Sequence, residues 1–540
     1  MLNRLIRWLA RGATRTPGVP DTVTTEPEPG ARTALESALR ASPDDPDLNY
    51  RTGLACLAAH DPAAALDYFH LALHYAPDMF SACAARGRAL AAMHRPAEEA
   101  SAYSEFLQAN PGHADAAYTL AAWHHARGEH EAAVELLRPV AERRPIHRDA
   151  CNLLGLILGR EFGQFAEADR MLQLALEPDP LWPVALSNRG WILLEQGKHE
   201  QGLKLLDAAL ERDPADHETR LARSYMKLKH GDFEHGWSDF EARRHSRFAP
   251  KRPQQFREWD GAPIPGKTLL VCAEQGLGDQ IMFASCFGEA IARAGRCVIE
   301  CNPKLVELFR RSFAAASVYP EAAAEEAPAW SRAREHIDRQ ILMGSLPGFF
   351  RRGREAFPRH AGYLRAAPER VAYWRSRLDA LGPGPKIGLS WRGGMASTRR
   401  HLRSLQLDQL LPLLLEPASF VSLQYGDCAA DLEALAGKHG VTLPHWRDAL
   451  DDYDETAALV CALDLVISVC TAIVHLAGAL GKPVWVLVPS IAEWRYLDQG
   501  ETLPWYPSAR LFRQAEPGRW QDVISQAAEQ CARLPRAAAG

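Results

Sequence analysis

Two short segments hold the residues whose types and spacing could support chemistry. The first is Glu274–Asp279, in which Gly276 and Gly278 permit close backbone approach and the following helix start offers amides to an anionic oxygen. Asp279 is suited to act as a general base toward a hydroxyl group, or to cap the helix electrostatically. A plain tight turn explains the two glycines equally well. Ile281 stands where a dinucleotide fingerprint needs its third glycine, and no P-loop Lys-Ser/Thr pair follows.

The second segment is Ser468–Gly478, where a buried strand is predicted to end and a helix of small residues to begin. Thr471 can donate its hydroxyl, and the backbone amides near Ala472 can hold a diphosphate. His475 follows Thr471 by four residues and therefore shares its helix face. The segment is suited to cradle a nucleotide diphosphate, and a capped helix with a hydrogen-bonded histidine is the alternative.

Basic side chains follow a third predicted strand end, at Trp391. They are Arg392, Arg399, Arg400 and Arg403. Guanidinium groups suit phosphate oxygens, although a solvated run of charges is the commoner use of such a cluster. Glu493–Tyr496 and Trp505–Arg510 add aromatic and arginine side chains, which favour either stacking on a base or sugar or a packed lid.

Short apolar runs in the second half of the chain predict the strands that position these segments. They are Thr268–Ala273, Cys297–Cys301, Lys386–Trp391, Phe420–Gln424, Leu463–Val469 and Val484–Val488. Apolar strands alternating with helix-length stretches are typical of parallel sheets in doubly wound α/β domains. The turn-rich Leu381–Pro385 divides the strands between two domains. Ligands of such sheets bind beyond the carboxyl ends of strands, which is where both segments fall.

The first half of the chain contains a sequence repeat instead, marked by regularly spaced prolines. Its prolines, separated by 34, 34, 34, 35 and 34 residues, are Pro43, Pro77, Pro111, Pro145, Pro180 and Pro214. In the clearest unit Gly53, Ala65, Phe69 and Ala72 occupy the small and aromatic positions of a tetratricopeptide repeat. Units from about residue 31 to 248 therefore predict an α-solenoid. Its concave surface suits a protein or peptide partner, and scaffolding of the second half is the alternative.

The amino-acid composition excludes several classes of protein and of partner. The chain has 540 residues, 47% of them hydrophobic and 24% charged, and a formal net charge of -5. This balance excludes a disordered or collagenous chain and provides no global basic field, so we expect no nucleic-acid partner. The 11 cysteines include no CxxC pair, which predicts neither a disulfide framework nor a zinc site and fits a reducing cytoplasm.

Membrane contact is expected to be weak at most. No run of 18 apolar residues is present, so we expect no transmembrane segment. Residues 1–11 place Leu2, Leu5, Ile6 and Leu9 on one helical face, which suits either peripheral membrane contact or a solvated terminus.

Motifs distributed over nearly the whole chain carry a family resemblance. They are Gly231–Trp237, Phe240–Arg244, Trp259–Gly261, Glu274–Asp279, Ser345–Pro347, Arg403–Ser404, Ser422–Gln424, Asp454–Ala458, Leu463–Ser468, His475–Trp485, Trp505–Pro507 and Leu511–Gln514. In this order they resemble the bacterial tetratricopeptide-repeat glycosyltransferases, whose C-terminal half is similar to the heptosyltransferases of lipopolysaccharide synthesis.

The resemblance implies two Rossmann-like lobes of GT-B type, the acceptor on the first and a nucleotide sugar on the second. Composition and the proline period predict a flexible tail and linker at 1–30 and a solenoid at 31–248, and the resemblance implies an acceptor-side lobe at 249–382 and a nucleotide-sugar lobe with a C-terminal helix at 383–540. Transfer would need no metal and no cofactor. Asp279 matches the proposed base, and Thr471 and His475 match the donor-binding stretch. From their places at the predicted strand ends, we also expect donor binding by Gly276, Gly278, Arg392, Cys470 and Ala472.

Cys470 departs from the family pattern, which has an aspartate at this position. That aspartate is thought to contact donor sugar hydroxyls, and a thiol does not replace a carboxylate as a strong acceptor. Two functions therefore stay open. One is a glycosyltransferase that modifies a protein recruited by the repeats, and the other is an interaction scaffold with a catalytically degenerate transferase-like half.

Overall fold

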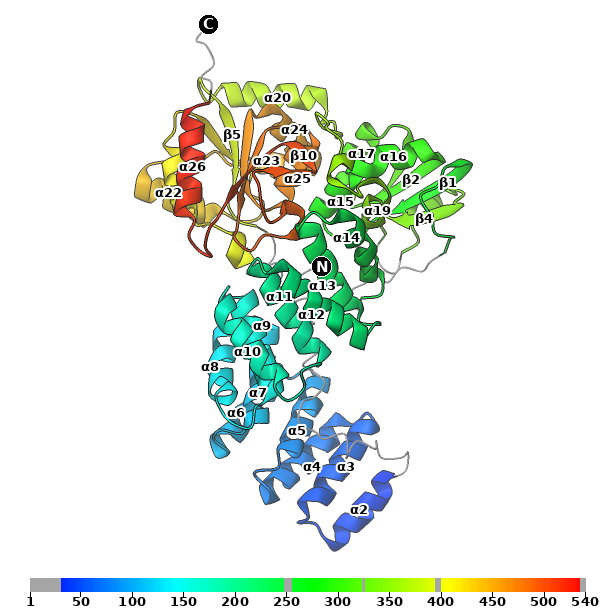
Figure 1. Cartoon of the computed structure of the whole chain (residues 1–540), viewed down its shortest axis with the longest axis vertical. Helices are drawn as coiled ribbons and strands as arrows, with labels where there is room; N and C mark the ends of the chain where they lie inside the picture. The colour runs from blue at the N-terminus through cyan, green and yellow to red at the C-terminus, as the bar shows by residue number, and fades with distance from the viewer. Residues whose placement is uncertain (1–30, 247–254, 323–325, 394–399, 535–540) are drawn as a thin grey trace. The chain divides into compact units, whose positions relative to one another are not determined.

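A computed structural model describes residues 31–246, 255–322, 326–393 and 400–534 of the chain (Figure 1). These residues fall into two compact units, one ending at Thr219 and the other beginning at Arg220. The first unit is helical and the second contains two β-sheets. The N-terminal segment for which we considered membrane contact lies outside the described residues. None of the described helices has both the length and the apolar character that crossing a membrane requires.

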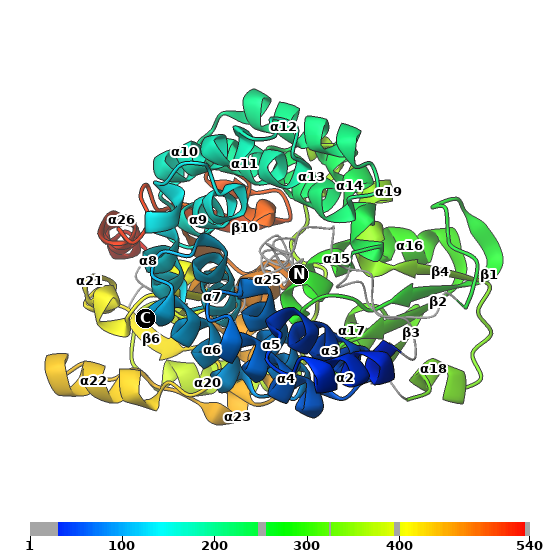
Figure 2. The same cartoon turned by 90° about the horizontal axis from the view of Figure 1, so that it is seen from below.

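The first unit consists of helices that pair in sequence. They are α2 (Ala31–Ala41), α3 (Pro46–Ala58), α4 (Pro62–Tyr75), α5 (Phe80–Ala92), α6 (Pro96–Ala109), α7 (Ala114–Arg127), α8 (His130–Ala141), α9 (Arg148–Arg160), α10 (Phe165–Leu176), α11 (Pro183–Glu195) and α12 (His199–Arg212). Figure 2 shows consecutive helices of this unit side by side, and each packs against the next. The tetratricopeptide-repeat solenoid predicted from the proline period is confirmed.

Small residues let the paired helices approach closely, as the repeat pattern predicts. A Cβ atom added to Gly53 of α3 would collide with the ring of Phe69 on α4, and one added to Gly87 of α5 would collide with Tyr103 on α6. The helix starts are also encoded locally: Asp45 accepts hydrogen bonds from two amides of the first turn of α3, which has proline at its first position.

The second unit begins with helices α13 (His217–Lys229), most of which belongs to it, and α14 (Phe233–Phe240), followed by the short helix η2 (Glu241–Arg244). Its first sheet is parallel, in the order β3-β2-β1-β4. The strands are β1 (Ile264–Cys272), β2 (Ala294–Cys301), β3 (Ala316–Pro320) and β4 (Arg339–Leu342). Helices α15 (Leu277–Phe283), α16 (Phe287–Arg293), α17 (Val306–Ser312), α18 (Ala329–Arg332) and α19 (Pro347–Phe350) lie between and after them.

The second sheet has the order β6-β5-β7-β8-β10-β9, with β9 alone antiparallel. Its strands are β5 (Lys386–Ser390), β6 (Ser419–Ser422), β7 (Leu465–Val469), β8 (Val484–Val488), β9 (Thr502–Leu503) and β10 (Tyr506–Arg513). The helices are α20 (Pro368–Asp379), α21 (Leu411–Leu414), α22 (Ala429–His439), α23 (Arg447–Leu450), α24 (Tyr453–Ala462), α25 (Ala472–Ala479) and α26 (Gln521–Ala532).

The α/β class predicted for the second half is therefore observed. Every residue of β5 and β7 is buried, which explains their continuous apolar sequence. One detail differs from the prediction: most of the segment considered as a lid or stacking surface, Trp505–Arg510, belongs to strand β10. All cysteines of the chain are free thiols.

Candidate functional site

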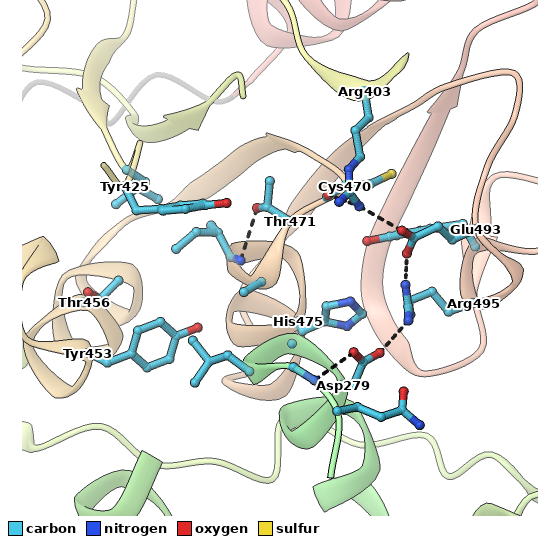
Figure 3. A pocket seen from close by; sticks show the side chains of 18 of the residues that line it. Asp279, Arg403, Tyr425, Tyr453, Thr456, Cys470, Thr471, His475, Glu493 and Arg495 are labelled. Atoms are coloured by element: carbon cyan, nitrogen blue, oxygen red, sulfur yellow. Dashed lines mark hydrogen bonds and ion pairs between the residues drawn. The ribbon is translucent and has the colours of Figure 1, made fainter. Parts of the chain in front are cut away.

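A cavity of about 430 Å³ lies within the second unit, and both sheets contribute to its lining (Figure 3). The loops that line it follow the carboxyl ends of β1, β6, β7 and β8. Both segments singled out in the sequence are present, Gln275–Asp279 after β1 and Cys470–His475 after β7. The cavity thus lies where ligands of open parallel sheets bind.

The Gly-Asp turn is shaped by Gln275, which adopts a positive φ of 63°, and by the approach of α15 to α25. Neither glycine of the turn has a positive φ. A Cβ atom on Gly278 would lie 2.9 Å from Cδ2 of His475 and 3.3 Å from Cα of Ala472, whereas one on Gly276 would meet Asp279 at 3.5 Å. Only Gly278 therefore needs to be a glycine, because it lets α15 approach α25 closely.

Asp279 performs the capping role that was one of its two predicted alternatives. Its Oδ2 accepts a hydrogen bond from the amide of Gly276 at 3.3 Å. Its Oδ1 accepts from Nη2 of Arg495, in the short helix η10 (Trp494–Tyr496) after β8, at 2.5 Å. Burial raises the pKa of Asp279, but the charge of Arg495, the field of His475 and the hydrogen bond from Gly276 all lower it, and the net pKa lies below its usual value. The carboxylate is ionised and, while paired, weakly basic.

The Asp279–Arg495 pair belongs to a chain of alternating charges across the cavity (Figure 3). Nη1 of Arg495 also contacts the carboxylate of Glu493, whose Oε1 in turn accepts from Nη1 of Arg403 at 2.9 Å. The same nitrogen of Arg403 lies 3.3 Å from the carbonyl oxygen of Cys470. All four charged side chains line the cavity, and two of them are guanidinium groups suited to phosphate oxygens.

Thr471 is the N-cap of α25, and it satisfies amides that the sequence analysis assigned to a diphosphate. Its Oγ1 accepts from the amide of Ile473 at 3.3 Å, and its carbonyl oxygen accepts from the amide of Val474 at 3.1 Å. The hydroxyl also lies 3.1 Å from Oγ of Ser468. The amides of Ile473 and Val474, near Ala472, therefore already have acceptors, and the cavity leaves an anion to be bound mainly by its arginines.

His475 and Cys470 are both buried and both uncharged. Burial lowers the pKa of His475 to about 3, and Nδ1 of its ring lies 3.0 Å from the Tyr506 hydroxyl. Burial raises the pKa of Cys470 to about 11. Its side chain points into the core, where Sγ lies 4.0 Å from the carbonyl oxygen of Leu487 on β8. A neutral imidazole can bind a ligand by hydrogen bonding but adds no positive charge to the cavity.

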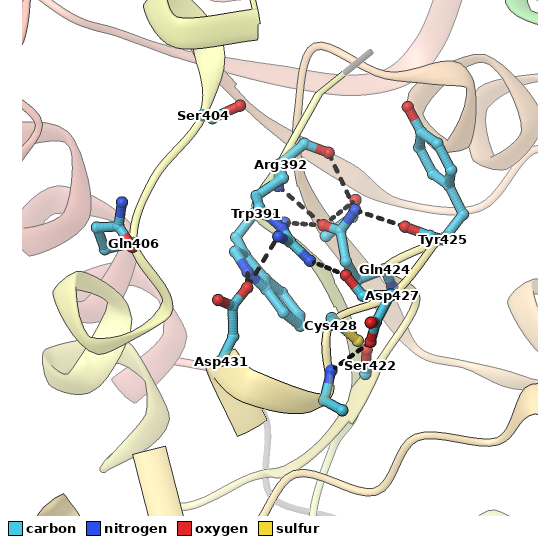
Figure 4. A network of polar contacts seen from close by, with 12 residues as sticks. Trp391, Arg392, Ser404, Gln406, Ser422, Gln424, Tyr425, Asp427, Cys428 and Asp431 are labelled. Atoms are coloured by element: carbon cyan, nitrogen blue, oxygen red, sulfur yellow. Dashed lines mark hydrogen bonds and ion pairs between the residues drawn. The ribbon is translucent and has the colours of Figure 1, made fainter. Parts of the chain in front are cut away.

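The predicted arginine cluster is divided. Arg403 lines the cavity, whereas Arg392 and the exposed Arg400 are absent from its lining, and Arg399 lies outside the described residues. Arg392 instead belongs to a separate network (Figure 4), in which Nη2 donates to the carbonyl oxygen of Asp427 at 2.6 Å and Nε lies 3.2 Å from Asp431. The structure therefore shows no contact of Arg392 with the cavity, because Asp427 and Asp431 take up its hydrogen bonds, and its part in donor binding stays a prediction.

Sequence reasoning missed the aromatic end of the cavity. Tyr425, Tyr453 and Thr456 lie on the side away from the charged residues (Figure 3), and Leu423 and Leu450 also line the cavity. Tyr425 is 46% exposed and lies three residues after the end of β6, so the strand-end rule could have found it. The cavity thus has an aromatic end and a charged end, an arrangement suited to a molecule with a flat ring and an anionic group.

Buried Arg243 positions the turn that carries Asp279. Its guanidinium contacts both carboxylate oxygens of Glu274, at 2.8 and 3.0 Å, and Oγ of Ser345 at 2.7 Å. Glu274 also accepts from the amide of Gly344 at 2.7 Å. Three of the sequence motifs, around Arg243, Glu274 and Ser345, therefore meet in one network directly before the Gly-Asp turn.

The fold and this cavity define a tetratricopeptide-repeat protein with a C-terminal α/β unit. The tetratricopeptide-repeat family matches residues 29–81, 159–217 and 187–234. Protein FlbA of Caulobacter vibrioides is 31% identical over 493 residues, which span 87% of this chain and 81% of FlbA. The chain belongs to the family of protein FlbA.

Two solved structures illustrate the similarity to part of this chain. One is YrrB, described as a TPR protein with an unusual peptide-binding site, at 20% identity and a TM-score of 0.29 over 35% of this chain and 96% of YrrB. Another is PilF of Pseudomonas aeruginosa, at 15% identity and a TM-score of 0.33 over 41% of this chain and 95% of PilF.

Proposed function

We propose that the second unit is a glycosyltransferase of GT-B type that moves a sugar from a nucleotide diphosphate to an acceptor hydroxyl. The observation that carries the proposal is that one cavity is lined both by Asp279, which follows β1 of the first sheet, and by Thr471 and His475, which follow β7 of the second. The two matched segments are far apart in the sequence, and a transferase of this type needs them on either side of one ligand.

The chemistry assigned to the cavity uses its two ends. The aromatic end, with Tyr425 and Tyr453, takes the nucleobase, and the charged end takes the diphosphate. Asp279 removes the proton from the acceptor hydroxyl as the oxygen attacks the sugar, and Arg403 and Arg495 stabilise the charge that develops on the departing diphosphate. We expect no metal or cofactor in this reaction.

Tetratricopeptide repeats indicate a role in protein interaction, and we propose that the solenoid recruits the acceptor as a protein or peptide. A second function fits the same repeats: an interaction scaffold whose α/β unit binds a nucleotide sugar without transferring it. The observation that favours it is Cys470, a buried thiol in the cavity lining where the related family has a carboxylate.

Thermal denaturation of the full chain with UDP, GDP, CDP and ADP and their sugar conjugates tests the proposed ligand. A nucleotide at 100 times its dissociation constant stabilises the native state by about 2.7 kcal/mol. Transfer and donor hydrolysis are then compared between the wild type and Asp279→Asn, for which we expect turnover to fall by a factor of about 10²–10⁴.

Asp431→Asn is the matched control, because Asp431 pairs with Arg392 outside the cavity lining and its side chain is 23% exposed, against 21% for Asp279. If no nucleotide stabilises the chain, the proposed function is wrong. Stabilisation without turnover, in both the wild type and Cys470→Asp, would favour the scaffold.

A further inference from the structure

Arg495 is the side chain that joins the two halves of the cavity. It lies in η10 after β8 of the second sheet, and it reaches Asp279, which follows β1 of the first sheet. The side chain is 13% exposed, and its guanidinium lies 5.2 Å from the ring centroid of Trp494, where its charge is attracted to the π-face. The position is thus built into the site and faces the cavity.

The contact conflicts with the role assigned to Asp279. One carboxylate oxygen accepts from Arg495 and the other from the amide of Gly276. A carboxylate held by a guanidinium is a poor proton acceptor, since its charged form is stabilised. Asp279 therefore cannot deprotonate a hydroxyl efficiently until Arg495 moves to another partner.

The charged end of the cavity offers an entering anion the guanidinium groups of Arg403 and Arg495, and Lys304 also lines the cavity. The amides of Ile473 and Val474 are satisfied by Thr471. Arg403 and Arg495 share the carboxylate of Glu493, so that two guanidinium groups are neutralised in part by one acid. A diphosphate provides more acceptor oxygens than one carboxylate and matches the two-pronged geometry of a guanidinium.

We propose that Arg495 binds the diphosphate of the donor and, in doing so, exchanges Asp279 for phosphate oxygens, which frees the Asp279 carboxylate to act as the base. This inference rests on the proposed function of the same cavity. It assigns to Arg495 two linked tasks, recognition of the donor and suppression of the base in its absence. It also predicts an order of events in which the donor binds before the acceptor is deprotonated.

Isothermal titration calorimetry of the full chain with UDP, GDP, CDP and ADP tests the exchange without relying on turnover. In the wild type the diphosphate must displace Asp279, so Asp279→Asn should tighten binding by about threefold to tenfold, which lies within the range that coupled neighbouring side chains show. Arg495→Gln should weaken it by about tenfold or more, because a charge-assisted bidentate contact is lost.

The double variant distinguishes the exchange from a general electrostatic effect. Removing the negative charge of Asp279 would favour the binding of any anion in the cavity. If the exchange occurs, however, the gain in nucleotide affinity from Asp279→Asn requires Arg495 to be present. We therefore expect Asp279→Asn to change affinity less than twofold when it is made in the Arg495→Gln chain. Asp431→Asn, at the Arg392 pair outside the lining, should leave affinity unchanged.

Each outcome decides between the two claims. Nucleotide binding by the wild type with an equal gain from Asp279→Asn in both backgrounds, or with no gain in either, overturns the exchange and leaves the proposed function standing. Absence of nucleotide binding in every variant overturns both. If Arg495→Gln does not fold, Arg495→Lys replaces it, because lysine keeps the positive charge but lacks the two-pronged guanidinium group. Adding Asp279→Asn to Arg495→Lys should then raise nucleotide affinity less than adding it to the wild type.

Discussion

Replacing Gly278 by alanine tests whether α15 and α25 meet as closely as the cavity requires. The added Cβ would lie 2.9 Å from Cδ2 of His475 and 3.3 Å from Cα of Ala472. The His475 ring is buried and held by Tyr506, and the Ala472 atom belongs to the backbone, so neither can turn away. Overpacking of this kind costs about 1–3 kcal/mol. We expect the free energy of unfolding to fall by that amount and the two helices to separate slightly.

Gly276→Ala is the matched control, since its Cβ would meet only Asp279, at the ordinary distance of 3.5 Å, and its φ of -88° suits alanine. The less favourable N-cap and the reduced entropy of the unfolded chain nearly cancel, leaving a change within about 0.5 kcal/mol. Urea denaturation followed by tryptophan fluorescence measures both variants, and hydrogen exchange locates the effect on α15 and α25. Equal stability of the two variants would show that the helices do not meet as described.

Two further perturbations address the groups around the turn. Arg243→Met leaves the buried carboxylate of Glu274 without its partner and should lower the free energy of unfolding by about 3–5 kcal/mol, whereas Arg352→Met, at an exposed pair, should cost about 1 kcal/mol or less in the same urea titration. His475 has a folded pKa of about 3 against 6.5 when exposed, so between these values the unfolded chain binds more protons and stability falls as the pH is lowered. His475→Gln should reduce this slope by up to about 1.4 kcal/mol per pH unit. The same dependence of the urea midpoint on pH between pH 5 and 7 in the wild type and in His475→Gln would contradict the burial of the ring.

The solenoid was predictable because its signal is local and repeated. Proline spacing fixes where helices start, and α3 begins at Pro46 and α5 at Phe80, each three residues after a proline of the period. Small positions such as Gly53 are fixed by contacts inside one helix pair. Buried strands were found for the same reason, since a strand covered on both faces is apolar throughout. Strands β3 and β4 were missed because several of their residues are only half-buried.

The residues around Asp279 were harder to predict because they depend on loops brought together by the fold. Arg392 and Arg495 have the same chemistry, and both follow strands of the second sheet. Local partners decide between them: Asp427 and Asp431 hold Arg392 outside the cavity lining, whereas Arg495 reaches across 216 residues of sequence to Asp279. Nothing in the spacing of either arginine encodes that difference.

The lining of the cavity makes the missing aspartate at Cys470 a weaker argument for a degenerate site than it is in the sequence alone. In the sequence, the missing carboxylate favours a degenerate site, because it removes an acceptor for sugar hydroxyls. In the structure, one nitrogen of Arg403 lies 3.3 Å from the Cys470 carbonyl oxygen and 2.9 Å from Glu493, which brings a carboxylate next to the start of α25 from another loop. The cavity therefore retains an acid beside this position, so the substitution at Cys470 does not leave the start of α25 without a neighbouring carboxylate.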